Sequence, residues 1–189
     1  MLRNPALQGK IFILYLSLSF LVAFPAAHVG HAASSVEIDA KVDAVLQDFY
    51  GKVGAGKKLA PMAEGILIFP SVLKAGFWIG GQYGEGALRI NDTTVDYYNI
   101  AGASLGFQFG AQSKAFILFF MKKKALSGFR DSKGWEAGVD GSVALANIGA
   151  GGTLDTNTHK KPIIGFVFDN KGLMVDLSLK GTKISKINK

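Results

Sequence analysis

Residues 69–90 read FPSVLKAGFWIGGQYGEGALRI, and this glycine-rich stretch decides the fold. Glycine inside a strand permits bends, bulges or the close approach of another backbone segment. The glycines do not match a dinucleotide-binding loop, because no strand–helix pattern surrounds them. We therefore expect residues 77–90 to be extended. Before them we expect a buried strand over Gly65–Phe69 that ends at Pro70, and a short helical turn over Ser71–Ala75.

The rest of the chain continues with short apolar runs between turn residues. Val95–Ile100 predicts a strand, and Gly102–Gly110 alternates apolar residues with glycine or polar residues at the period of a strand. Ala115–Met121 (AFILFFM) is apolar on both faces, which indicates a central strand. Ala137–Ile148 predicts an extended segment, and Pro162–Ser178 predicts a hairpin.

One amphipathic helix precedes these strands. Ser34 and Glu37 have the spacing of a capping box, in which each side chain bonds a backbone N–H of the first turn. The apolar residues that follow share one face of a helix, and glycines end it: Ile38, Val42, Val45, Leu46, Phe49 and Val53, then Gly51, Gly54 and Gly56. The fold class is therefore α+β and β-rich, with an N-terminal amphipathic helix on a twisted antiparallel sheet or on a partial barrel or sandwich.

Residues 1–32 have the pattern of a cleaved secretory signal peptide. Arg3 and Lys10 precede the 14-residue apolar run Ile11–Phe24, and small residues stand before Ala33. As a helix this run spans about 21 Å, too short for a membrane core of ~30 Å. We expect cleavage, a single domain over residues 33–189, and an exported protein that is periplasmic or envelope-associated in a bacterium and soluble after cleavage. The formal net charge then falls from +7 to +5, because two basic residues and no acid are removed.

The composition excludes several kinds of chemistry. The chain has no cysteine and three histidines, of which only His159 lies beyond the signal peptide. Disulfides, thiolate metal sites and a cysteine nucleophile are therefore excluded, and we expect no metal and no cofactor. We expect no enzyme: Ser104 lies in a G-x-S-x-G sequence, Gly102–Gly106, but this run has the alternation of a strand and not the strand-to-helix turn of a nucleophile elbow. A hydrolase remains an alternative if the carboxylates of Glu85, Asp140 and Asp176 converge.

Basic residues gather at two places. Lys122, Lys123, Lys124 and Arg130 follow the apolar strand, and further lysines end the chain. Positive charge beside apolar groups suits anionic lipid headgroups. The same charge would attract nucleic acid, but export argues against that partner. The four residues are the candidate headgroup-binding site.

Four ordered blocks resemble the SYLF domain, a family that includes eukaryotic actin-patch regulators and exported bacterial proteins. The first block lies in residues 69–90, the second is ASLGFQFGAQSKAFILFFM, the third GVDGSVALANIGAGG and the fourth GLMVDLSLKGTKI. The positions that carry the resemblance are Pro70, Leu73, Lys74, Ala75, Gly76, Gly80, Gly84 and Gly86, then Gly106, Gln108, Gly110 and Gln112, and finally Gly172, Leu173, Gly181 and Ile184.

The resemblance implies lipid or membrane binding, with phosphoinositides as ligands of the eukaryotic members. Actin binding is not expected here, since an exported protein meets no actin. The sequence thus predicts non-catalytic binding to a phospholipid or membrane surface. The alternative is a structural or assembly protein of the cell envelope that acts through protein contacts, and the sequence leaves the oligomeric state open.

Overall fold

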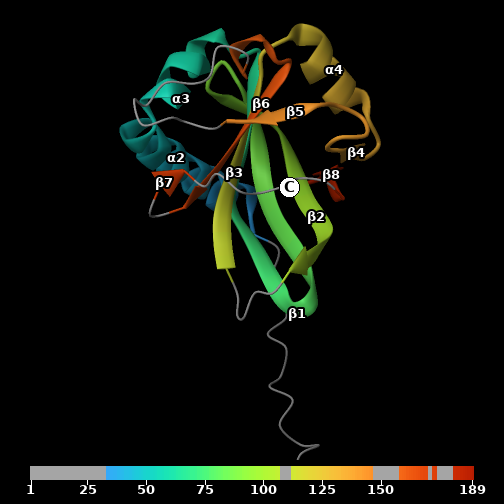
Figure 1. Ribbon diagram of the computed structural model, residues 1–189. Coiled ribbons are helices and arrows are strands. Elements are labelled where there is room, and N and C mark those ends of the chain that lie inside the picture. Colours follow the sequence, from blue (N-terminus) through green and yellow to red (C-terminus); the bar gives the residue numbers. More distant parts are fainter. Residues whose placement is uncertain (1–32, 107–111, 147–157, 170–171, 174–180) are drawn as a thin grey trace, which may run out of the picture. The chain divides into compact units, whose positions relative to one another are not determined.

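The computed structural model describes residues 33–106, 112–146, 158–169, 172–173 and 181–189 (Figure 1). The predicted signal peptide and the signature residues Gln108 and Gly110 lie outside these ranges. In chain order the helices and strands are α2 (Ser35–Lys52), α3 (Gly54–Leu59), the 3-10 helix η2 (Ala60–Met62), β1 (Gly65–Ile90), β2 (Thr93–Gly106), β3 (Gln112–Phe120), α4 (Lys123–Asp131), β4 (Trp135–Glu136), β5 (Val143–Leu145), the 3-10 helix η3 (Thr158–Lys160), β6 (Ile163–Asp169), β7 (Gly172–Leu173) and β8 (Thr182–Ile187).

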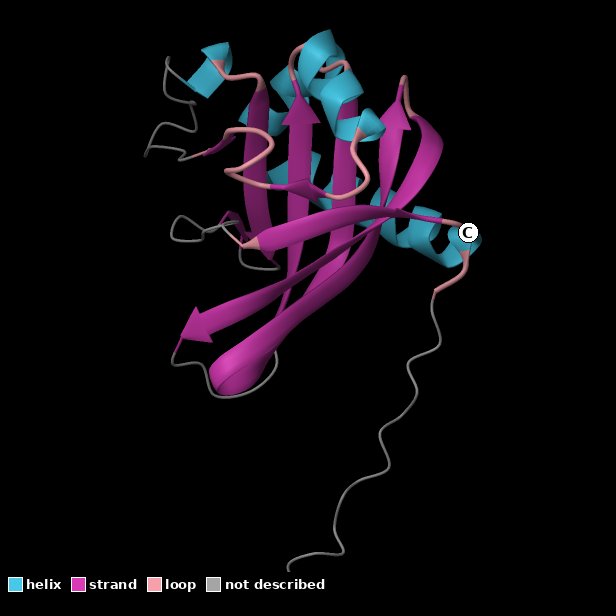
Figure 2. Ribbon diagram, turned by 90° about the vertical axis from the view of Figure 1, so that its right-hand side faces the viewer, coloured by secondary structure: helices cyan, strands magenta, loops and turns pink. Residues whose placement is uncertain are grey.

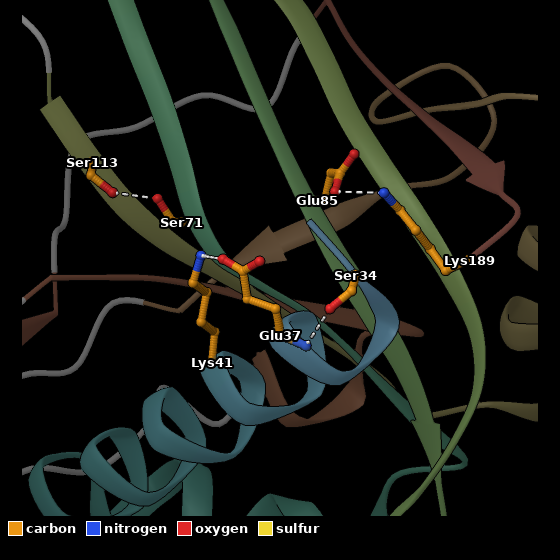
Figure 3. A network of polar contacts seen from close by, with 7 residues as sticks. All are labelled: Ser34, Glu37, Lys41, Ser71, Glu85, Ser113 and Lys189. Carbon is orange, nitrogen blue, oxygen red and sulfur yellow. Dashed lines mark hydrogen bonds and ion pairs between the residues drawn. The ribbon is translucent and has the colours of Figure 1, made fainter. Parts of the chain in front are cut away.

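Helix α2 forms as its sequence predicts. The Ser34 Oγ accepts a hydrogen bond of 3.2 Å from the Glu37 N–H, and the Lys41 ammonium pairs with the Glu37 carboxylate at 2.6 Å (Figure 3). The apolar stripe is buried against the sheet, and the Phe49 ring lies in T-shaped contact with the rings of Phe166 and Phe168. Each buried large apolar side chain contributes about 1.5–3 kcal/mol, so this face fixes the helix on the sheet.

The glycines Gly51, Gly54 and Gly56 do not end the helical structure as predicted. Gly51 lies inside α2, and Gly54 begins a second short helix, α3. The break falls at Val53, whose backbone leaves the helical region. A Cβ at Gly56 would overlap the Phe49 ring. This glycine therefore serves packing between α3 and α2 and does not end a helix.

Strand β1 passes through the position where the sequence predicted its end. The predicted helical turn over residues 71–75 is also wrong, since these residues are extended. Pairing with β3 changes register between Phe69 and Val72, and Pro70 lies at this irregularity. A bulge leaves a residue without its ladder hydrogen bond, so a proline that lacks an N–H is tolerated there.

The glycines of β1 allow two parts of the strand to touch. A Cβ at Gly86 would overlap the Ile68 carbonyl oxygen, and a Cβ at Gly84 would lie 2.6 Å from the Ser71 carbonyl oxygen. Residues this far apart in sequence meet because β1 turns back on itself toward its lower end in Figure 1. The predicted close backbone approach is confirmed at these two glycines.

The strands form one mixed sheet in the order β4-β8-β2-β1-β3-β6-β5, with β7 paired to β6 (Figure 2). The first part of β1 pairs with β3 and its second part with β2, so the sheet curls into a half-barrel. All strand pairs are antiparallel among the described residues except β5 with β6, which is parallel. The β-rich α+β class is confirmed.

Two apolar clusters hold the sheet. One joins α2 and α3 to β1, β3 and β6, and the other joins α4 and Trp135 to β1, β2, β3, β6 and β8. Strand β3 contributes alternate residues to both, which confirms it as the predicted central strand. In the part of the chain that the structure describes, no helix is long and apolar enough to cross a membrane.

Several segments differ from the predictions or complete them. The run after the lysines forms α4, which was not predicted. Of the described residues of the predicted extended segment Ala137–Ile148, only Val143–Leu145 form a strand. The C-terminal strand β8 was likewise not predicted. Of the predicted hairpin Pro162–Ser178, β6 and the two residues of β7 pair antiparallel through Phe168 and Leu173, and residues 174–178 lie outside the described ranges.

Candidate functional site

The predicted lysines surround the start of helix α4. Lys122 is the N-cap residue, and Lys123 and Lys124 form the first turn. The helix begins here because the Lys122 carbonyl accepts hydrogen bonds from the N–H groups of Ala125 and Leu126, at 3.0 and 3.1 Å. Leu126 is buried, and this fixes one face of the helix on the sheet.

This helix start departs from the usual electrostatics. No side chain caps it, and no acidic residue lies in its first turn. The N-terminus of a helix carries partial positive charge, so lysines there are unfavourable and an anion is stabilised. All three lysines are exposed, and within the described ranges none of their ammonium groups forms an ion pair. The site is therefore strongly electropositive and faces solvent.

A pocket of about 370 Å³ opens beside two of these lysines. Lys122 and Lys124 line it, whereas Lys123 does not. The remaining lining residues come from α4, from the β4–β5 connection and from the start of β6: Ala125, Gly128, Phe129, Trp135, Asp140, Gly141, Ser142, Pro162 and Ile163. The pocket thus combines cationic side chains with apolar and aromatic ones.

Trp135 forms part of the apolar wall and is held from several sides. It pairs with Ile184 of β8, and its ring meets the Phe129 ring edge-on at a centroid distance of 5.7 Å. Gly141 lies against the indole, since a Cβ there would approach Trp135 Cζ2 to 2.7 Å. The pocket wall is therefore rigid on the tryptophan side.

Asp140 is the acidic residue of the pocket lining. Its carboxylate accepts a 2.7 Å hydrogen bond from the Glu136 N–H, and this bond closes the turn after β4. Gly138, with a φ of 90°, supplies the left-handed backbone that this turn requires. The Asp140 carboxylate thus stabilises the turn. Because two lysines and one aspartate line the pocket, the formal charge of the lining is positive.

Arg130 lies in a different cluster from the lysine pocket. Its guanidinium contacts the Asp96 carboxylate through Nη2 at 3.1 Å and Nε at 3.2 Å, and Lys186 also pairs with this carboxylate. Asp96 is 9% exposed in its side chain, so this contact ties the end of α4 to β2 and β8. Burial, with a smaller effect of Asp96, raises the pKa of the neighbouring Tyr98 to about 12. Of the four predicted residues, the structure brings Lys122 and Lys124 together in the pocket.

The signature residues have structural positions. Pro70, Lys74, Gly76, Gly80, Gly84 and Gly86 lie in β1, Gly106 ends β2, Gly172 begins β7, and Gly181 precedes β8. Gly181 has a φ of 73°, which favours glycine at the turn into that strand. These residues shape the sheet and line neither the lysine pocket nor its rim.

The carboxylates considered for catalysis have other partners. Glu85 pairs with the Lys189 ammonium at 2.9 Å (Figure 3). The Glu85 carboxylate also accepts a hydrogen bond from the Tyr83 hydroxyl. Asp140 belongs to the turn after β4, and Asp176 lies outside the described residues. Across the described ranges, no cluster of three or more acidic or histidine side chains has a geometry that could hold a metal ion.

A second pocket of about 390 Å³ lies between helices α2 and α3 and the β1–β2 turn. Arg89, Lys57 and Asp92 are its charged lining residues. Arg89 is already paired with Asp43 at 2.6 Å, and this ion pair links α2 to β1. Lys57 and its neighbour Lys58 are exposed on α3, which makes them a useful reference for the lysines of α4.

Comparison with known families identifies a match in the C-terminal half of the chain. Residues 101–189 match the Ysc84 family model, described as "Las17-binding protein actin regulator". The predicted SYLF resemblance is confirmed there. The Ysc84 match includes α4 and every residue that lines the lysine pocket. A search of curated proteins finds no match to the chain.

The lysines of this matched segment are recognisable in the sequence, whereas the pocket is not. Phe129 and Trp135 gave a weak local signal, a three-residue spacing from Leu126 to Phe129 followed by a lone tryptophan. Ile163 lies on strand β6, far from both residues in the sequence, so its place in the wall depends on the sheet order. Only the fold could reveal that these side chains meet.

Proposed function

We propose that this protein binds anionic phospholipid, without catalysis, through the N-terminus of α4. The observation that carries the proposal is the uncapped helix start with three exposed lysines beside a pocket lined by aromatic and aliphatic side chains. Lipid phosphate is an anion, and the helix N-terminus and ammonium groups both stabilise anions. The apolar lining suits the part of a lipid that adjoins its headgroup.

The expected strength follows from charge. Each basic residue near an anionic membrane surface contributes about 1 kcal/mol. Lys122, Lys123 and Lys124 together would contribute about 3 kcal/mol, which corresponds to roughly a 100-fold stronger partition. Exposed charges are screened by salt, so binding weakens as ionic strength rises.

The family match supports a binding role. Its description names Las17 binding and actin regulation for the family. For this chain we propose lipid rather than actin as the partner, because we also propose that residues 1–32 direct its export to the periplasm or cell envelope. The proposed protein is soluble after removal of that segment and docks on a membrane from solution.

Liposome flotation tests this proposal. Protein purified after expression of the full-length chain is mixed with phosphatidylglycerol-containing or pure phosphatidylcholine vesicles, at low and high salt. We expect flotation with the anionic vesicles alone, reduced by salt. The triple variant K122A/K123A/K124A is expected to lose about 100-fold in partition.

The matched control is K57A/K58A, which removes two exposed lysines from α3. If net charge alone governed binding, this control would lose about 30-fold; the proposal expects a change of less than about 3-fold. Absence of flotation at low salt, or full binding by the triple variant, would contradict the proposal. A defined envelope-protein complex formed without lipid affinity would favour the assembly role instead.

A further inference from the structure

The lysine pocket has a shape that surface attraction to a membrane does not need. Charge-driven docking requires exposed cations and no cavity. The volume of about 370 Å³ lies within the range of roughly 300–1,000 Å³ that is typical of small-molecule sites. The space is therefore large enough to admit part of a single small molecule.

The apolar part of the lining lies next to the cations. Phe129, Trp135 and Ile163 are each 2% exposed or less, so their side chains are fixed by the core and offer a preformed wall. Lys122 and Lys124 belong to the same lining. A ligand that satisfies both parts needs one anionic group and one apolar group close together.

Gly128 keeps one side of the pocket open. It lies inside α4, where glycine is a poor helix former, yet a Cβ at this position would meet no atom within 4 Å. Packing thus does not require glycine here. Gly141, which also lines the pocket, differs, because a Cβ there would press on the Trp135 ring.

The turn that carries Asp140 exposes an apolar side chain next to the pocket. Val139 is 74% exposed, although valine favours burial. Because Val139 directly precedes Asp140 of the pocket lining, this exposed apolar side chain suits contact with the region just below lipid headgroups. The entrance to the pocket is therefore compatible with a ligand that comes from a membrane.

We propose that the pocket holds one anionic phospholipid molecule. Its phosphate lies between Lys122 and Lys124 at the helix N-terminus, and its glycerol and first acyl carbons lie between Gly128 and Trp135. The inference rests on the proposed function and adds to it a stoichiometric site with an apolar subsite. The occupant is a phospholipid because charge complementarity and the apolar wall are both required.

Titration with a soluble short-chain phosphatidylglycerol, below its micelle concentration, tests this inference. Calorimetry is expected to show saturable binding of one lipid per protein, with a change in tryptophan fluorescence from Trp135. Variant G128L fills the open side of the pocket and leaves every lysine in place. It is expected to weaken binding of the soluble lipid at least tenfold while flotation with anionic vesicles persists.

Variant G51L is the matched control, since Gly51 lies in α2 and a Cβ there also meets no atom within 4 Å. It should bind the soluble lipid as the wild type does, and G128A provides a milder substitution if G128L unfolds. Wild-type binding of the soluble lipid by G128L and G128A, or no saturable binding by the wild type, would overturn the pocket inference. Flotation of the wild type that does not depend on Lys122, Lys123 and Lys124 would overturn the proposed function separately.

Discussion

Helices α2 and α4 both pack on the sheet, and they begin in opposite ways. Helix α2 starts at a serine cap with an acidic residue in its first turn, and its apolar stripe is buried. Helix α4 starts without a cap, with lysines in its first turn and a glycine in its middle. The first follows the rules of helix stability, and the second departs from them at the site where we propose that lipid binds. Functional sites are where such departures are expected.

The largest expected effect is a loss of stability at helix α2. Phe49→Ala removes a fully buried ring that contacts Phe119, Phe166 and Phe168. We expect a loss of about 3–5 kcal/mol in the free energy of unfolding, measured by urea denaturation. Lipid binding by the folded fraction should remain normal. A loss below about 1 kcal/mol would show that α2 is not the main anchor of the sheet.

Exchanging the two helix starts sharpens the comparison directly. Lys122→Ser supplies the missing cap at a residue whose backbone is already extended, with φ −136° and ψ 135°. We expect a gain of about 1 kcal/mol in stability and about a fivefold loss in partition to anionic vesicles. The reciprocal variant Ser34→Ala should lose about 1 kcal/mol and bind lipid normally.

This pair of variants separates stability from binding. If Lys122→Ser proved less stable than the wild type, the backbone N–H groups at the start of α4 would not lack a cap that serine can supply. If it bound vesicles as tightly as the wild type, Lys122 would not contact the membrane.

Arg130 distinguishes two cationic regions within the same helix. Its guanidinium is engaged by Asp96, so we expect Arg130→Ala to lower stability by about 1 kcal/mol and to change vesicle partition less than Lys124→Ala does. Thermal unfolding and flotation of the two variants check this. Equal losses in partition would show that Arg130 also contributes to the headgroup-binding site.

The effect that is smallest at neutral pH appears only under alkaline conditions. Burial raises the pKa of Tyr98 to about 12, above the usual 10, so the folded state disfavours the phenolate. Between pH 10 and 12 the unfolded chain releases this proton first, and stability falls as pH rises. Tyr98→Phe should remove about 1–2 kcal/mol of that loss, measured as the difference in unfolding free energy between pH 9 and pH 11.5. An unchanged pH dependence would mean that Tyr98 is not the titrating group.

The same comparison explains what the sequence could predict. Helix α2 has a periodic apolar stripe and strand β3 a continuous apolar run, so local sequence was sufficient to predict both. The prediction that a strand ends at Pro70 was wrong, because a proline at a register shift does not end a strand. Helix α4 was missed because it contains two buried residues, a lysine run and a glycine, which is a weak helical pattern.

The candidate site shows the same limit. The lysines were recognised from composition, since a run of like charge is visible in any context. The pocket depends on Trp135, Ile163 and the packing of β4 on β8, which are non-local. The role of Gly84 and Gly86 was predicted in kind, as close approach, but the partner segment Ile68–Val72 required the fold.

The most direct test of the central claim is the salt dependence of partition to phosphatidylglycerol vesicles, compared between the wild type and K122A/K123A/K124A. The account predicts a steep decrease with salt for the wild type and a shallow one for the variant, because the α4 lysines carry the screened charge. The K57A/K58A control should follow the wild type. Parallel salt curves for all three proteins would contradict the claim that the start of α4 is the lipid-binding site.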